Sequence, residues 1–171
     1  MKHLLPLPRR LGIRLAAIAL TLAPLAVSAL DVGKPAPEFS LSGTDKTIRL
    51  ADYRGKLVYL DFWASWCGPC KQSFPWMNEL QKKYAAQGLR IIAVNVDQKR
   101  DDAARFLNEN PANFAVAFDP TGATPKSYQV KVMPSSMLIA PDGTVQLVHA
   151  GFRDDEKQAI EQKIRAALGN P

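Results

Sequence analysis

The sequence has 171 residues, 47% of them hydrophobic and 22% charged, and a formal net charge of +6. This length corresponds to one domain and a short extension. Four of the 22 lysines and arginines, but no acidic residue, precede residue 30, so the rest of the chain has 18 basic against 16 acidic residues, a net charge of +2. Such a small excess gives no support to nucleic-acid binding.

Residues 1–29 have the pattern of a secretory signal peptide. Basic residues up to Arg14 precede an uncharged apolar run that ends in small residues at Ala29. We therefore predict cleavage after Ala29, which leaves residues 30–171 as the folded domain. The alternative is an uncleaved membrane anchor, because residues 11–30 approach the roughly 18 apolar residues that a membrane-spanning helix needs.

The first half of this domain is predicted to contain a hairpin, a buried strand and a helix. Two short apolar segments flank a polar turn within residues 39–50, which indicates a β-hairpin. Residues 57–63 are almost continuously apolar, as in a buried parallel strand. Apolar residues then recur on one helical face from Phe74 to Tyr84, which predicts a helix.

The second half alternates strands and helices before a closing hairpin. Residues 91–96 and 114–118 are predicted strands, and the apolar spacing over residues 103–110 predicts a helix between them. A turn and a short helix follow. Residues 136–148 indicate a second hairpin, and residues 160–168 an amphipathic helix. We therefore expect an α/β fold with a central mixed β-sheet flanked by helices on both faces.

Both cysteines of the chain lie in one motif, Trp66-Cys67-Gly68-Pro69-Cys70. Two thiols at this spacing can close a small disulfide ring and open it again. If Cys70 lies one turn into a helix, Cys67 lies at the helix N-terminus, where free N–H groups and the macrodipole favour a thiolate. The pKa of Cys67 would then be lowered, which makes this thiol the candidate nucleophile.

Other uses of the two cysteines fit the sequence less well. A zinc site takes about four ligands, whereas the chain beyond residue 29 has two cysteines and one histidine, His149. Haem attachment requires a histidine directly after the second cysteine, where this chain has Lys71. A structural disulfide across two residues restricts the unfolded chain little. We therefore predict a redox-active dithiol without metal or cofactor, and we assign His149 no catalytic role.

Asp61 is the one charged residue in the apolar run before the motif. Strand alternation places it on the face with Tyr59 and Trp63, under the helix that follows. A buried carboxyl group without a partner has a raised pKa, which suits a proton acceptor for a nearby thiol. The alternative is a carboxylate in an ion pair with a lysine such as Lys56.

The stretch Asp61-Phe62-Trp63-Ala64-Ser65-Trp66-Cys67-Gly68-Pro69-Cys70-Lys71 resembles the active-site segment of thioredoxin. The flanking sequence is similar to that of the extracytoplasmic TlpA/ResA/CcmG(DsbE)-like thiol:disulfide oxidoreductases, from Gly33 to the C-terminal helix. This resemblance implies a thioredoxin-like fold with an N-terminal β-hairpin and a central αβ insertion.

The resemblance also implies which residues contact a substrate. Pro134 would follow a cis peptide bond and face the two cysteines. The backbone of Met133 would then pair with an extended substrate segment, a form of strand addition. Gly68 and Pro69, between the cysteines, would lie at the same contact.

Three further positions have two interpretations each. Trp66 would flank the motif at the surface and contact substrate, or it would be a partly buried aromatic residue. Gly151 resembles a glycine near the docking surface of thioredoxin, or it is an ordinary turn glycine. Asp97 resembles an acidic position near the site, or it is a solvated loop residue.

The predicted function is that of an exported thiol:disulfide oxidoreductase that reduces protein disulfides. Cys67 would attack the substrate disulfide, Cys70 would resolve the mixed disulfide, and Asp61 would accept the Cys70 proton. Two alternatives remain. One is a copper-binding thioredoxin-fold chaperone, although such proteins usually have a wider cysteine spacing. The other is a peroxiredoxin-like thiol peroxidase, although Ser65-Trp66-Cys67 fits a peroxidatic motif poorly.

The resemblance finally implies partners and a location. The protein would act in the periplasm, or anchored to the inner membrane and facing the periplasm. A reductant there must be recharged, which implies a membrane electron donor of the DsbD or CcdA type. Candidate substrates are apocytochrome c during cytochrome c maturation, copper-site thiols, isomerases and other periplasmic proteins.

Overall fold

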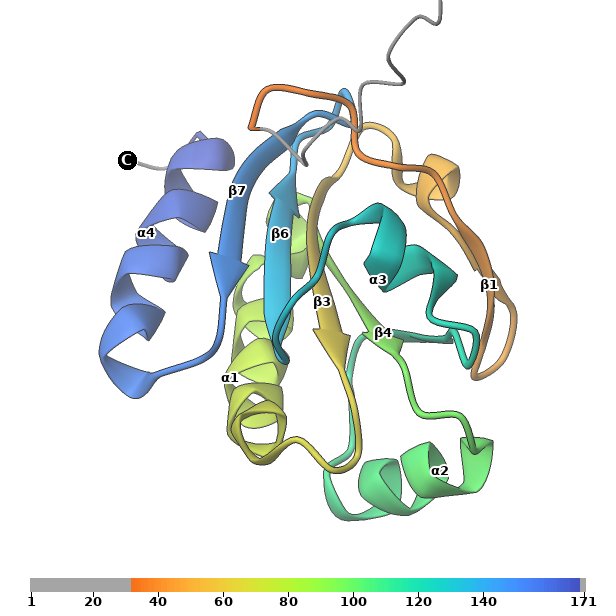
Figure 1. The fold of residues 1–171 in the computed structure, drawn as a ribbon. Helices are drawn as coiled ribbons and strands as arrows, with labels where there is room; N and C mark the ends of the chain where they lie inside the picture. Colours follow the sequence, from red (N-terminus) through yellow and green to blue (C-terminus); the bar gives the residue numbers. More distant parts are fainter. Residues whose placement is uncertain (1–31, 170–171) are drawn as a thin grey trace, which may run out of the picture.

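The computed structural model describes residues 32–169, so the predicted signal peptide and its cleavage site lie outside the described residues. Within residues 32–169, no helix is both long and apolar enough to cross a membrane. One sheet dominates the fold, and helices cover both of its faces (Figure 1).

The sheet has seven strands in the order β2-β1-β5-β4-β3-β6-β7. The strands are β1 (Ser40–Gly43), β2 (Thr47–Arg49), β3 (Leu57–Trp63), β4 (Leu89–Asn95), β5 (Ala115–Phe118), β6 (Ser135–Ile139) and β7 (Val145–Ala150). β4 runs parallel to both β3 and β5, whereas the other neighbouring pairs are antiparallel. The predicted mixed sheet and both predicted hairpins are confirmed.

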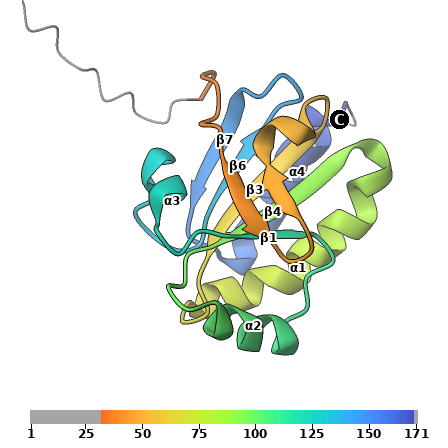
Figure 2. The same cartoon turned by 90° about the vertical axis from the view of Figure 1, so that its right-hand side faces the viewer.

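The helices lie on opposite sides of this sheet. They are α1 (Gly68–Tyr84), α2 (Arg100–Glu109), α3 (Ala123–Ser127) and α4 (Lys157–Ala167), with short 3-10 turns η1 (Leu50–Tyr53), η2 (Ala85–Gln87) and η3 (Asp154–Glu156). α1 and α4 pack on one face and α3 lies against the other, which the view in Figure 2 shows from the side. α2 and β5 form the predicted central insertion.

β3 is central because both of its faces are buried. All seven of its residues are buried, and the six apolar ones divide by alternation between two apolar clusters. Tyr59 and Trp63 join the cluster that includes α1, α2 and α4 residues, whereas Leu60 and Phe62 join the opposite one with Tyr128. Trp63 makes ring contacts with Phe74 of α1 and Phe106 of α2, 4.9 and 4.6 Å between centroids. This packing fixes the start of α1 relative to the end of β3.

Candidate active site

The two cysteines form a disulfide at the N-terminus of α1. Cys67 is the N-cap residue, and its Sγ accepts a hydrogen bond of 3.2 Å from the Cys70 backbone N–H. Pro69 in the first turn removes no helical hydrogen bond, because the first N–H groups of a helix have no intrahelical acceptor. The helix dipole favours negative charge at this end, so the position of Cys67 would stabilise a thiolate.

The two sulfur-bearing residues differ in access to solvent. Both belong to the apolar cluster under α1, but Cys67 is 5% exposed, whereas Cys70 is 0% exposed. An incoming substrate can therefore reach Cys67 first, and Cys70 is protected behind it. Gly68 and Pro69, between them, are exposed.

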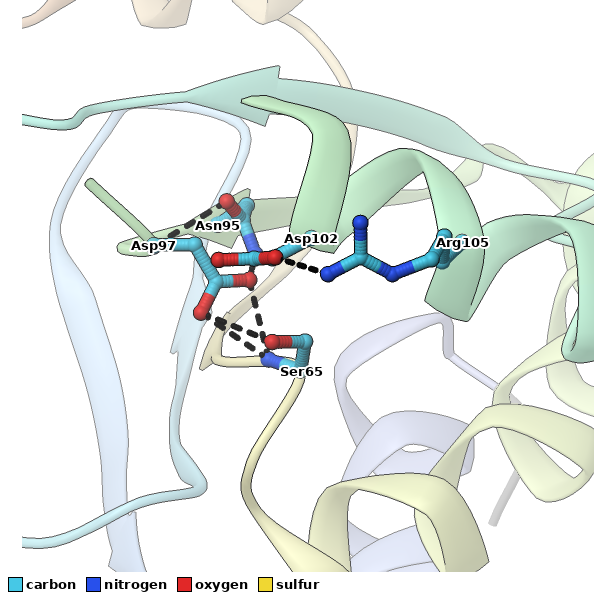
Figure 3. A network of polar contacts seen from close by, with 5 residues as sticks. All are labelled: Ser65, Asn95, Asp97, Asp102 and Arg105. Atoms are coloured by element: carbon cyan, nitrogen blue, oxygen red, sulfur yellow. Dashed lines mark hydrogen bonds and ion pairs between the residues drawn. The ribbon is translucent and has the colours of Figure 1, made fainter. Parts of the chain in front are cut away.

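A buried carboxylate holds the loop that precedes the disulfide. Asp97, just beyond β4, accepts hydrogen bonds from the Ser65 backbone N–H at 2.9 Å and from the Ser65 hydroxyl at 3.0 Å (Figure 3). The Asn95 side-chain amide donates to the same carboxylate at 2.8 Å. Asp97 is only 6% exposed, so its interpretation as a solvated loop acid is wrong. The Asp102–Arg105 ion pair drawn beside it joins two residues of α2.

Asp61 is buried on the face of β3 that α1 covers. It is 2% exposed, and its Oδ2 atom has no hydrogen-bond partner within residues 32–169. Burial raises the pKa of Asp61 well above its ordinary value, because the charged form loses its hydration. No ion pair joins Asp61 to any described residue, and Lys56 is exposed, so the alternative of a Lys56–Asp61 pair is wrong.

Pro134 follows a cis peptide bond from Met133, as predicted. It lies directly before β6, and its carbonyl oxygen accepts a hydrogen bond of 2.8 Å from the Gly151 backbone N–H. Gly151 has φ +88°, in the left-handed region where glycine is favoured, and open space lies where a Cβ atom would be. A backbone hydrogen bond thus joins Pro134 and Gly151, two of the predicted substrate-contact residues.

The described surface also has two further features, an exposed indole and a groove. Trp66 is 72% exposed, so its interpretation as a partly buried residue is wrong. The groove, of about 600 Å³, is lined by Met133 and by residues around α3, among them Lys126 and Lys131.

Sequence reasoning missed one buried polar contact. The Tyr59 hydroxyl donates a hydrogen bond of 2.8 Å to Ser136 Oγ, and both residues are 2% exposed. Ser136 is the cross-strand partner of Asp61. The one sequence signal was the polar Ser136 in the predicted strand that ends at Ile139. Its contact with Tyr59 could not be predicted from that signal, because it depends on the register between β3 and β6.

A cysteine at the N-terminus of a helix, disulfide-bonded to a fully buried cysteine in the first turn of that helix, in a thioredoxin-like fold, defines a thiol:disulfide oxidoreductase. Residues 32–148 match the AhpC/TSA family, and the chain belongs to this family.

Curated relatives and solved structures agree with this class. The chain is 40% identical over 137 residues to the thiol-disulfide oxidoreductase ResA of Bacillus thuringiensis subsp. konkukian, which covers 80% of this chain and 78% of that protein. ResA of Bacillus subtilis is 38% identical over 123 residues, 71% of this chain and 69% of that one. A crystal structure from Chlorobium tepidum, provisionally assigned as a thiol:disulfide interchange protein DsbE, has a TM-score of 0.82 and 57% identity over 82% of this chain and all of that one. A protein of this class exchanges disulfides with protein thiols.

Proposed function

We propose that this chain is an exported reductase of protein disulfides. The observation that carries the proposal is the difference in burial between Cys67, 5% exposed at the N-terminus of α1, and Cys70, which is 0% exposed. This arrangement supports attack by one thiol and resolution by the other. The Gly-Pro dipeptide between the cysteines, which is similar to that of thioredoxin, supports the reducing direction.

The proposed reaction has two exchange steps. The Cys67 thiolate attacks one sulfur of a substrate disulfide, forms a mixed disulfide and releases the other substrate sulfur as a thiolate. Cys70 then attacks Cys67, which forms the Cys67–Cys70 disulfide and releases the second substrate sulfur. Two electrons pass from the protein to the substrate. Asp61 takes the Cys70 proton in the second step, since a buried carboxylate with a raised pKa is a suitable acceptor.

The proposed substrate contact lies around this disulfide. Trp66 offers an exposed apolar surface, and Gly68 and Pro69 leave the approach to Cys67 uncovered. Met133 and Pro134 would bind an extended segment on the other side, with Gly151 behind them. The groove lined by Met133 supports the binding of an extended segment at this residue.

The proposal also includes the location of the protein and its partners. Residues 1–29 would direct export and be removed after Ala29, which places residues 30–171 in the periplasm. An uncleaved segment would instead anchor the domain to the inner membrane. Outside the cytoplasm the oxidised protein would be reduced again by a membrane donor of the DsbD or CcdA type. Substrates would include periplasmic proteins such as apocytochrome c.

Two experiments test this proposal. The reduced full-length protein should reduce a protein disulfide stoichiometrically, and Cys67→Ser should abolish that reaction. A reduced wild-type protein that leaves the substrate oxidised would contradict the proposal. N-terminal sequencing of the exported protein tests processing, since a mature start at Met1 would exclude cleavage after Ala29.

A further inference from the structure

Three polar side chains lie next to one another across the sheet, on the face that α1 and α4 cover. Asp61 of β3 pairs with Ser136 of β6, and Ser136 pairs with His149 of β7. Cross-strand partners share a face of the sheet, with Cβ atoms about 4.5–5.5 Å apart. The row starts at the buried Asp61 and ends at His149, whose Nε2 lies 3.3 Å from Glu156 Oε2 without hydrogen-bond geometry.

Tyr59 fixes the hydroxyl group in the middle of this row. Its ring makes an edge contact with Trp76 of α1, 5.9 Å between centroids, and its hydroxyl donates to Ser136 Oγ at 2.8 Å. Because Ser136 Oγ accepts this bond, its own proton is left to donate. The residues on either side of Ser136 each have a buried atom without a hydrogen-bond partner within residues 32–169, Asp61 Oδ2 and His149 Nε2.

Asp61 has no cation that would compensate its charge. Its other cross-strand partner is Ala93 of β4, which has no polar side chain, and no described residue forms an ion pair with it. A buried carboxylate must then be stabilised by neutral donors or stay protonated. Of the two lateral neighbours of Asp61, only Ser136 offers a donor.

We propose that Ser136, oriented by Tyr59, is a positioning residue that donates a hydrogen bond to Asp61 when the carboxyl group ionises. This inference rests on the proposed role of Asp61 as the acceptor of the Cys70 proton. When the proton moves from Cys70 to Asp61, Cys70 sulfur bonds to Cys67 and the substrate thiolate leaves, while Ser136 keeps its own proton.

Ser136 would therefore determine the pH above which the Asp61 carboxyl group is ionised and can accept the Cys70 proton. The titratable groups that the structure places beside Ser136 are Asp61 and Tyr59 on β3 and His149 on β7, and Glu156 of η3 lies 3.3 Å from His149. Burial and the nearby Asp61 both raise the pKa of Tyr59, so the Tyr59 hydroxyl stays neutral and keeps its proton for Ser136.

The test is a direct titration of the Asp61 carboxyl group in the full-length protein. Carbon-13 NMR of labelled aspartate reports it, and Asp61→Asn assigns the signal. Ser136→Ala should raise the apparent pKa of Asp61 by about one pH unit or more, because the charged form loses its donor. Ser136→Thr keeps a hydroxyl group and should restore the wild-type value.

The role of Tyr59 needs its own variant and a matched control. Tyr59→Phe should raise the same pKa by a smaller amount, because Ser136 remains but is no longer oriented. Tyr128→Phe also removes a buried hydroxyl, which donates to the Pro37 carbonyl at 2.6 Å on the opposite face of the sheet. That control should leave the titration of Asp61 unchanged.

Two results would overturn the inference. An unchanged or lower pKa of Asp61 in folded Ser136→Ala would exclude Ser136 as the donor. A shift confined to His149, followed in the same variant with labelled histidine, would show that the hydroxyl serves the imidazole instead. If Ser136→Ala does not fold, Ser136→Cys, a weaker donor, should give a rise in the same direction. The titration uses no substrate, so it stays informative even if the reduction of protein disulfides is not found.

Discussion

The Asp97 carboxylate accepts hydrogen bonds from both the backbone N–H and the hydroxyl of Ser65, two residues before Cys67. This contact ties the end of β4 to the loop between β3 and α1. The loop carries Trp66 at the surface and presents Cys67 at the start of α1. The position of the reactive sulfur thus depends on a buried acid from a neighbouring strand.

Asp97→Ala should therefore weaken both the fold and the reaction. We expect the free energy of unfolding to fall by about 1–3 kcal/mol, because Ser65 and Asn95 lose a charged acceptor. The exchange rate with a protein disulfide should also fall. Urea unfolding and single-turnover kinetics measure the two effects.

Asp102→Ala, which removes a partly exposed ion pair with Arg105, should change stability by no more than about 1 kcal/mol. Equal effects of the two variants would contradict the assigned role of Asp97.

Asp61→Asn should stabilise the oxidised protein increasingly as the pH rises. The folded state raises the pKa of Asp61 by burial, so between the unfolded and folded values the unfolded state is ionised while the folded state keeps its proton. Stability contributed by the protonated carboxyl group is therefore present at low pH and is lost as the pH rises through this window, by up to about 1.4 kcal/mol per pH unit. Asparagine does not ionise, so the variant avoids the loss.

Urea unfolding of the oxidised protein at a series of pH values checks this expectation. The advantage of Asp61→Asn should be absent near pH 4, grow with pH and become constant above the folded pKa. Asp52→Asn, at a side chain that is 58% exposed, is the matched control and should show no such growth. A constant difference across the pH range would show that Asp61 is not buried as described.

The two cysteine variants should differ in what they trap. Cys70→Ser leaves the more exposed thiol, that of Cys67, but removes the resolving one, so it should accumulate a mixed disulfide with a protein substrate. Cys67→Ser should form little or none, because the remaining thiol is 0% exposed. Non-reducing electrophoresis with mass spectrometry reads out the adducts. Preferential trapping by Cys67→Ser would reverse the assignment of the two thiols.

Trp66→Ala should affect substrate contact more than stability. The side chain is 72% exposed, so we expect the free energy of unfolding to change by no more than about 0.5 kcal/mol. The value of kcat/KM for a protein disulfide should fall several-fold, while that for a small disulfide should change less. Val148→Ala, at another exposed apolar residue, is the control and should leave both values unchanged. Equal losses with both substrates would argue against a docking role for Trp66.

Much of the fold was predictable because its signals are local. The apolar run of β3, the two hairpins and the spacing from Phe74 to Tyr84 specify elements within a few residues of sequence. The place of the cysteines at the start of a helix follows from the same kind of pattern. Burial of Asp61 followed from strand alternation alone.

The polar contacts around the site were not predictable in the same way. Tyr59 and Ser136 are 77 residues apart, and they meet only because of the register between β3 and β6. Asp97 is buried because the loop with Ser65 folds over it, which no pattern around Asp97 indicates. Such contacts depend on tertiary packing, so local sequence left both interpretations of Asp97 open.

The reduction potential of the Cys67–Cys70 couple tests the central claim most directly. It can be measured by equilibrating the full-length protein with a thiol–disulfide buffer of known potential. A reductase of protein disulfides predicts a value near that of thioredoxin, about −270 mV. A value near about −120 mV, as for a strong disulfide donor, would contradict the account and reverse the direction of electron flow.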